Sequence, residues 1–382
     1  MAGEHNIVRV SNVVKSFKLG SNEVRALKGV DLTVRSGHYL SIMGPSGSGK
    51  STLFNMIGGL DKPSSGQVFI DEVDISQLDA YELAWLRCRK IGYIFQTFNL
   101  IPVMTALENV TLPMTFAGMS ADAATEKGIH LLEIVGLGER FRHKPSELSG
   151  GQQQRVGVAR ALSADPEILL MDEPFGAIDP INRDQIQDEF MRLQSRLKKT
   201  VAFVSHDIHE AIKMADRIAT FRGGQLIQYD TPEVILTQPR NKFVSDFVGA
   251  DRALKVLGLI RARDAMNPEP ANLIDGNMPS PEALNLLVEK NRKTGIVIRQ
   301  DKPVGYVTPK LLKFEKGPAA DVAEPFQVFV EDDEPLRDVL SSMLMDSMDF
   351  YCVVDDGGRF KGTINYRDIQ NKILELYDDD AN

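Results

Sequence analysis

Short apolar runs alternate with helical patterns through the first two thirds of this chain. Three of these runs, at residues 39–43, 168–171 and 201–204, each come before a polar turn and a helical stretch. This order is typical of an α/β domain in which helices cover a parallel sheet. Between residues 61 and 145 the pattern becomes mostly helical, so we expect a helical subdomain inserted into that domain.

The second part of the chain has a different character. Beyond about residue 250 prolines become frequent, and Gly305-Tyr306-Val307-Thr308 is echoed 57 positions later by Gly362-Thr363-Ile364-Asn365. An apolar run and a helix start come before each of these segments in the same order, which predicts two copies of one supersecondary unit. We therefore expect two domains, residues 1–249 and residues 250–382.

A glycine-rich loop lies between the apolar run at 39–43 and a helical run at 52–57. Its glycines allow a tight turn that directs several N–H groups at one anion, and the positive end of the following helix adds to the attraction. Lys50 can reach the β- and γ-phosphates of a nucleotide, and the Ser51 hydroxyl can ligate Mg²⁺. We expect a nucleoside triphosphate to bind through Gly44, Pro45, Ser46, Gly47, Ser48, Gly49, Lys50, Ser51 and Thr52.

Two adjacent carboxylates, Asp172 and Glu173, end the apolar run at 168–171. Because side chains alternate along a strand, one can hold Mg²⁺ while the other polarises a water molecule. We assign Asp172 to the metal and Glu173 to the water. Gln96, which follows another apolar run, can contact both the metal and the attacking water. Its alternative interpretation is a polar residue that only ends a strand.

His206 directly follows the run at 201–204 and can donate to the γ-phosphate, although a histidine at a strand end is often only a satisfied hydrogen-bonding group. The next residues, from Asp207 to Glu210, have the spacing of a capping box at the start of a helix. This spacing gives Asp207 a structural role first.

Composition narrows the functional classes. The 382 residues are 43% hydrophobic and 25% charged, which is ordinary for a globular protein with a sizeable core. A net charge of −9, without a basic block, argues against nucleic acid as a partner. Cys88 and Cys352 lie far apart and indicate a reducing cytoplasm. No apolar run is long enough to cross a bilayer, so a membrane role must come through a partner.

A second glycine-rich helix start, Ser149-Gly150-Gly151-Gln152, is able to grip another anion. The phosphate loop, Gln96, this segment, the Asp172-Glu173 pair and His206 occur in the order found in the ATP-binding subunits of ABC transporters. Residues 7–248 resemble that family. The resemblance implies the P-loop fold of ABC type, with ATP and Mg²⁺ as cofactors and ATP hydrolysis coupled to transport.

The resemblance also implies a head-to-tail homodimer, in which ATP on one subunit's phosphate loop is closed over by Ser149 and Gly151 of the other. Phe17 matches the aromatic position that stacks on adenine in the family, with a core aromatic as the alternative. Asp179, in the segment Gly176-Ala177-Ile178-Asp179, is similar to a conserved aspartate of the family.

Residues 255–376 resemble a tandem pair of CBS domains, small βαββα modules that in many proteins bind adenosine nucleotides between the copies. Copies that bind nucleotide tend to have Ser or Thr followed three residues later by Asp. The first copy keeps Thr308 but has Leu311, and the second keeps Asp368 but has Asn365. Two interpretations of Asp368 stay open, a ribose ligand and a helix cap. The pair itself either senses an adenine or cyclic dinucleotide or serves as a dimerising module.

An ABC-type ATPase followed by CBS domains resembles the ATP-binding subunits of importers for glycine betaine, proline or carnitine, and so do residues 175–183 and 229–249. Residues 24–30, 55–61 and 95–102 are instead similar to lipoprotein-releasing and macrolide-export ATPases. We expect an ATPase that works peripherally on the cytoplasmic face of the membrane and drives a permease to import a quaternary amine. The alternatives are the ATPase of such an exporter and a soluble ABC-type ATPase without a transport role. The transported compound, the CBS ligand and the sign of regulation stay open, as does the role of the acidic residues 378–380.

Overall fold

The computed structural model of this chain describes residues 5–20, 22–176, 178–346 and 348–378. The chain forms two compact units. The first runs to Ile235 and includes Pro239–Val248, and the second combines Leu236–Gln238 with the chain from Gly249 on. Ala177, in the segment after Glu173, and the acidic positions 379 and 380 lie outside the described residues.

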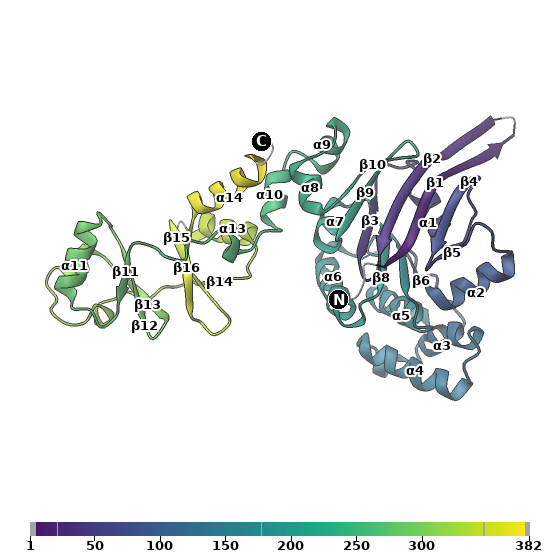
Figure 1. Cartoon of the computed structure of the whole chain (residues 1–382). Coiled ribbons are helices and arrows are strands. Elements are labelled where there is room, and N and C mark those ends of the chain that lie inside the picture. The colour runs from purple at the N-terminus through teal and green to yellow at the C-terminus, as the bar shows by residue number, and fades with distance from the viewer. Residues whose placement is uncertain (1–4, 21, 177, 347, 379–382) are drawn as a thin grey trace. The chain divides into compact units, whose positions relative to one another are not determined.

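A six-stranded sheet in the order β10-β9-β3-β8-β7-β6 forms the centre of the first unit (Figure 1). Its strands are β3 (Tyr39–Met43), β6 (Ile91–Phe95), β7 (Ile168–Asp172), β8 (Thr200–Val204), β9 (Arg217–Arg222) and β10 (Gln225–Asp230). All neighbours pair in parallel except β9 and β10. The predicted parallel sheet is thus confirmed. Every residue of β8 is buried, as expected for a strand with helices on both faces.

A second sheet of four antiparallel strands, in the order β2-β1-β4-β5, shares its core with the first. Its strands are β1 (Asn6–Leu19), β2 (Asn22–Arg35), β4 (Ser65–Ile70) and β5 (Val73–Asp74). Val10, Leu27, Ile42 and Leu53 belong to one buried cluster, which joins both sheets to α1 (Lys50–Ile57). The loop between β3 and α1 is therefore anchored at both ends in the main hydrophobic core.

Helices fill the rest of the first unit. The expected helical subdomain lies between β6 and β7, where α3 (Ala106–Phe116), α4 (Ala121–Ile134) and α5 (Gly150–Leu162) pack on one another (Figure 1). The other helices of this unit are α2 (Ala80–Lys90), α6 (Pro180–Leu197), α7 (Ile208–Met214), α8 (Pro232–Thr237), which continues into the second unit, and α9 (Lys242–Val248). Among the described helices of the whole chain, none has the length and apolar character needed to span a membrane.

The second unit contains the predicted repeat. Each copy has a three-stranded sheet in which the first two strands are parallel and the last two antiparallel. The first copy holds β11 (Leu273–Asp275), α11 (Ser280–Glu289), β12 (Gly295–Arg299), β13 (Lys302–Val307) and α12 (Pro309–Leu312). The second holds β14 (Val330–Glu331), α13 (Leu336–Asp346), β15 (Phe350–Val354), β16 (Phe360–Asn365) and α14 (Tyr366–Asp378), and α10 (Arg252–Leu257) precedes both.

The segment that leads into each copy pairs with the last strand of the other copy. Asn267, before the first copy, forms a bridge with Thr363 on β16, and Glu324, before the second copy, forms a bridge with Tyr306 on β13. Both bridges carry two backbone hydrogen bonds, with N···O distances of 2.7 to 2.9 Å. The two copies are therefore interlocked rather than strung in line.

Candidate active site

The phosphate loop turns between β3 and α1 with its glycines in conformations that other residues avoid. Gly44 has φ +147° and Gly49 has φ +107°. A Cβ atom on Gly44 would lie 2.2 Å from the carbonyl oxygen of Phe221, and one on Gly49 would lie 2.7 Å from that of Ala26. Glycine is required at both positions because the neighbouring backbone leaves no room for a side chain. Gly49 also begins α1 without a side-chain cap, so this helix end has no internal acceptor of its own.

Lys50 folds back over the loop. Its ammonium group donates hydrogen bonds to the carbonyl oxygens of Gly44 at 2.8 Å and Pro45 at 3.0 Å. Burial lowers the pKa of Lys50, while the negative charges of Glu173 and Asp172 act in the opposite direction. The structure thus brings the lysine of the loop into the electrostatic range of both predicted carboxylates.

Asp172 ends β7, beside Phe95 of β6 and Val204 of β8. Burial raises the pKa of Asp172, and so does the charge of Glu173, whereas Lys50 lowers it. Glu173 has φ +45°, the left-handed conformation, although it carries a full side chain. Such a conformation costs on the order of 1 kcal/mol or more, and it is typical of residues held in place for function. The carboxylate pair therefore sits at a strained turn directly beyond the sheet.

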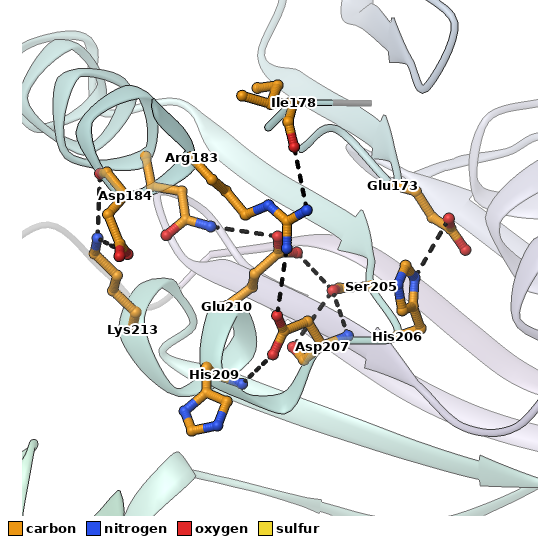
Figure 2. Close-up of polar contacts among 11 residues, drawn as sticks. Glu173, Ile178, Arg183, Asp184, Ser205, His206, Asp207, His209, Glu210 and Lys213 are labelled. Carbon is orange, nitrogen blue, oxygen red and sulfur yellow. Dashed lines mark hydrogen bonds and ion pairs between the residues drawn. The ribbon is translucent and has the colours of Figure 1, made fainter. Parts of the chain in front are cut away.

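His206 lies across from Glu173. Its Nδ1 atom is 3.4 Å from Oε2 of Glu173, and its side chain is 66% exposed (Figure 2). Gln96 follows β6 and is exposed, and its Nε2 atom would be 3.2 Å from a Cβ atom on Gly176. Ser51 is exposed and Thr52 is half-buried at the start of α1. The ends of three neighbouring strands therefore carry the predicted catalytic side chains, open to solvent on one side.

Ser149 and Gln152 bind each other at the start of α5. The Ser149 hydroxyl accepts from the Gln152 N–H at 3.3 Å, and the Gln152 side-chain oxygen accepts from the Ser149 N–H at 3.0 Å. Gly150 is exposed, and a Cβ atom on Gly151 would lie 3.3 Å from Cδ1 of Ile186. This helix start is thus a complete capping box.

Phe17 and Asp179 are the remaining predicted site residues. Phe17, on β1, is 42% exposed, and the Lys15 ammonium lies 5.0 Å from the centre of its ring. A core role for this ring is therefore wrong. Asp179 is exposed, and its backbone oxygen accepts from the Arg183 N–H at 3.1 Å.

The structure revises the expected cap of α7. Asp207 caps the helix by accepting from the His209 N–H at 2.8 Å, as predicted. Glu210 does not complete the box, because the Asp207 N–H already donates to Ser205 Oγ at 3.0 Å. The Glu210 side chain turns inward and accepts from Ser205 Oγ at 2.6 Å. Sequence spacing missed this inward contact, since nothing in the spacing separates a surface cap from a buried acceptor.

A groove of about 650 Å³ opens beside α2 and the segment after β6. Large apolar side chains stand exposed along it: Tyr81 is 79% exposed, Trp85 55% and Phe116 75%. Phe95 and Asn99, on either side of Gln96, contribute to the same lining. Contiguous exposed aromatic side chains of this kind mark protein–protein contact sites.

The second unit has a polar cavity of about 280 Å³ between its copies. Arg292 and Asn272 of the first copy line it together with Thr363 and Asn365 of the second. Asp368 lies outside this lining and forms a reciprocal cap with Asn365, whose N–H donates to Asp368 at 2.9 Å. The structure therefore supports the capping interpretation of Asp368.

Known proteins share this architecture. The sequence matches the ABC transporter family model over residues 27–176 and the CBS domain model over residues 319–375, which is the second copy of the repeat. It is 40% identical to the "Osmoprotectant import ATP-binding protein OsmV" of Salmonella typhimurium, over 94% of each chain. The chain belongs to the ABC transporter ATP-binding proteins. As a member of that family it is an ATPase with a CBS domain.

Other relatives of this ABC protein extend over both of its units. It is 36% identical to the "Glycine betaine/carnitine/choline transport ATP-binding protein OpuCA" of Bacillus subtilis, over 98% of this chain and 99% of that protein. Among solved structures, it resembles the ATP-binding cassette MJ0796 in a dimeric post-hydrolysis state bound to ADP and Pi, with a TM-score of 0.54 and 44% identity. That match covers 59% of this chain and 98% of the other, so it concerns the ATPase unit.

Proposed function

We propose that this chain is the ATP-hydrolysing subunit of an importer for a quaternary amine or related osmoprotectant such as glycine betaine. The observation that carries the ATPase part is the convergence of Lys50, Asp172, Glu173 and His206 at one end of the parallel sheet. The substrate class rests on relatives such as OsmV and OpuCA, whose names state osmoprotectant import and glycine betaine transport. Their similarity includes the CBS unit, which favours import over export or a soluble role.

The phosphate loop fits a nucleotide. Lys50 now donates to two loop carbonyls, and a triphosphate would offer it stronger, charged acceptors. Ser48 Oγ is buried beside Gly44 and has no hydrogen-bond partner among the described residues. A buried hydroxyl without a partner is available to bind a ligand atom. We assign nucleotide binding to residues 44–52, with Phe17 against the base.

Three oxygen-bearing side chains, Ser51, Gln96 and Asp172, make a suitable donor set for Mg²⁺, which prefers hydroxyl, amide and carboxylate oxygens. Within the described residues there is no group of three His, Cys, Asp or Glu side chains that could hold a metal. This agrees with a metal held by one carboxylate, neutral side chains and substrate phosphates. When bound, Mg²⁺ would neutralise charge on the phosphates.

Glu173 and His206 act on the attacking water and on the γ-phosphate. Glu173 orients and polarises the water, and its φ of +45° marks a strained turn directly after the strand. His206, 3.4 Å from Glu173, donates to the γ-phosphate. Ser149 and Gly151 close over the nucleotide of the partner subunit, with Gly150 and Gln152 completing the helix start, and we include Asp179 among the nucleotide-binding residues.

We place the permease contact in the groove that Tyr81, Trp85 and Phe116 line. It adjoins the segment after Gln96, so movement of a docked permease helix can reach a metal ligand through a few residues of chain. For the cavity between the CBS copies we propose an adenine or cyclic dinucleotide, because Arg292 can bind a phosphate group, while the asparagines and Asp349 can hydrogen-bond a base edge or a ribose. A purely dimerising role for this pair is the alternative.

The catalytic assignment is tested by Glu173→Gln in the full chain. An amide keeps the shape of the side chain and can still hydrogen-bond, but it is a far poorer base, so ATP binding should persist while turnover falls by about 100-fold or more. Glu167→Gln is the matched control, since Glu167 precedes the same strand and pairs with Lys90 instead. Undiminished phosphate release by Glu173→Gln would remove Glu173 from its role.

The transport assignment is tested by purifying the chain with its membrane partners and reconstituting the complex in vesicles. ATP-dependent uptake of radiolabelled glycine betaine, lost with Glu173→Gln, is the expected result. Co-purification with a permease that has a large extracytoplasmic domain, without uptake, would support the exporter alternative. Stimulation of the ATPase by ribosomes or DNA without any membrane partner would support the soluble one.

A further inference from the structure

A buried carboxylate stands behind the histidine of the site. Glu210, in the first turn of α7, is 6% exposed. Its Oε2 atom accepts from the Ser205 hydroxyl at 2.6 Å (Figure 2). Its Oε1 atom accepts from Gln187 Nε2 at 3.3 Å. Burial raises the pKa of Glu210, and the bond from Ser205 opposes that rise. Burying a carboxyl group costs free energy unless hydrogen bonds compensate for the lost water.

Ser205 connects this carboxylate to both sides of His206. Its hydroxyl donates to Glu210 and accepts from the Asp207 N–H at 3.0 Å. Its own N–H donates to the Ile42 carbonyl of β3 at 3.4 Å. The residues before and after His206 are therefore tied to one buried acceptor, and His206 itself is left largely exposed, facing Glu173.

Arg183 joins the same turn to the loop that follows Glu173. Its Nη2 atom donates to the Ile178 carbonyl at 3.2 Å, and its Nη1 atom lies 3.8 Å from Asp207 Oδ2. Figure 2 shows Arg183 between Ile178 on one side and Asp207 and Glu210 on the other. The backbone beyond Glu173 and the backbone around His206 thus have a common support.

Other contacts besides the bond between Gln187 and Glu210 join α6 and α7. On the exposed side of this junction Lys213 forms ion pairs with Asp184 at 3.1 Å and Asp188 at 2.8 Å. Ala211 and Met214 of α7 are buried. The bond from Gln187 ties Glu210 to α6, and the bond from Ser205 ties it to the residue before His206.

We propose that Glu210 is a positioning residue for His206: through the Ser205 hydroxyl it fixes the backbone turn that presents His206 to the γ-phosphate. Arg183 extends this support to Ile178. Glu210 acts through the hydroxyl of Ser205, from which it accepts a hydrogen bond. The inference rests on the role proposed for His206, and it adds Glu210 as a residue on which that role depends.

A double-mutant cycle in the full chain tests this link, with kcat and KM for ATP as the readouts. We expect His206→Ala to lower kcat by about 100-fold and Glu210→Ala to lower it by about tenfold, with KM changed by less than about twofold. If Glu210 acts only through His206, the double variant will match His206→Ala within about twofold, because the contribution of Glu210 is already lost. Glu210→Gln keeps an acceptor for Ser205 and should restore most of kcat.

Two further variants keep the test decisive. Ser205→Ala removes the link with a small change of volume, so it should reproduce the Glu210→Ala effect even if Glu210→Ala folds poorly. Lys213→Ala, the matched control, loosens the same helix junction on its exposed side and should leave kcat near wild type. If the losses of kcat caused by Glu210→Ala and His206→Ala multiply in the double variant, the inference about Glu210 is overturned, while the role proposed for His206 stands. Wild-type kcat in His206→Ala would overturn the role proposed for His206, and the inference with it.

Discussion

Gly305 offers a sharp test of the interlocked repeat, because a single methyl group at this position meets backbone. A Cβ atom on Gly305 would lie 2.3 Å from the carbonyl oxygen and 2.8 Å from the carbonyl carbon of Glu324. To accept alanine, Glu324 must move by several tenths of an ångström, since real Cβ atoms essentially never lie within 3.0 Å of such an atom. That movement breaks the bridge between Tyr306 and Glu324, whose two N···O distances are 2.8 and 2.9 Å.

The expected cost follows from these contacts. Losing two backbone hydrogen bonds costs about 1–3 kcal/mol, and the displaced backbone adds about 1–3 kcal/mol of overpacking strain. The φ angle of Gly305 is not in the left-handed region, so alanine regains about 0.4–1 kcal/mol through the unfolded chain. The net free energy of unfolding should fall by about 3 kcal/mol, which corresponds to roughly 10 °C in the Tm of the second unit.

Differential scanning calorimetry of the full chain measures this shift, and hydrogen exchange at the Tyr306 and Glu324 amides reports the bridge directly. Gly317→Ala is the matched control, because its Cβ atom would find only an ordinary contact at 3.8 Å from Asp321 Oδ2. Gly362→Ala, which would meet the Asn267 carbonyl at 2.5 Å, should behave like Gly305→Ala. A Tm equal to that of Gly317→Ala, with the Tyr306 amide still protected, would refute the close approach.

Three more results are expected. Burial raises the pKa of the Cys352 thiol to about 12, so iodoacetamide should alkylate half-buried Cys88 well before Cys352 in the native chain; equal rates by mass spectrometry would contradict the burial. Asn109→Ala removes four hydrogen bonds to the segment after Gln96 and should cost about 2–4 kcal/mol, with faster proteolysis there; unchanged Tm and cleavage would argue against this role. The hydrogen bond from Lys90 lowers the pKa of Asp71, so the stability it contributes is present above about pH 4 and is lost as pH falls through the lowered pKa. The Tm of Asp71→Asn should therefore fall less than the wild-type Tm between neutral and acid pH. An equal fall in both proteins would contradict this prediction.

The sequence by itself determined the local features of this protein. The phosphate loop could be predicted because its chemistry is set by neighbouring residues: glycines for a tight turn, then Lys50 and Ser51 at a helix start. The parallel strands could be predicted from short apolar runs, each followed by a polar turn and a helical stretch. The repeat could be predicted from the segments that begin at Gly305 and Gly362. The sequence did not show why glycine is needed there: each glycine lets a segment from outside its own copy approach the backbone.

Only the tertiary structure decided what lies between distant segments. The spacing from Asp207 to Glu210 is the same for a surface cap and for an inward acceptor, and the choice depends on Ser205, which occupies the Asp207 N–H first. Asp368 is the opposite case, because its partner, the N–H of Asn365, lies three residues away at the same helix start. Local motifs are encoded by short-range geometry, whereas the burial of a carboxylate depends on helices that pack across the chain. That packing is a property of the folded core, and no spacing along the sequence contains it.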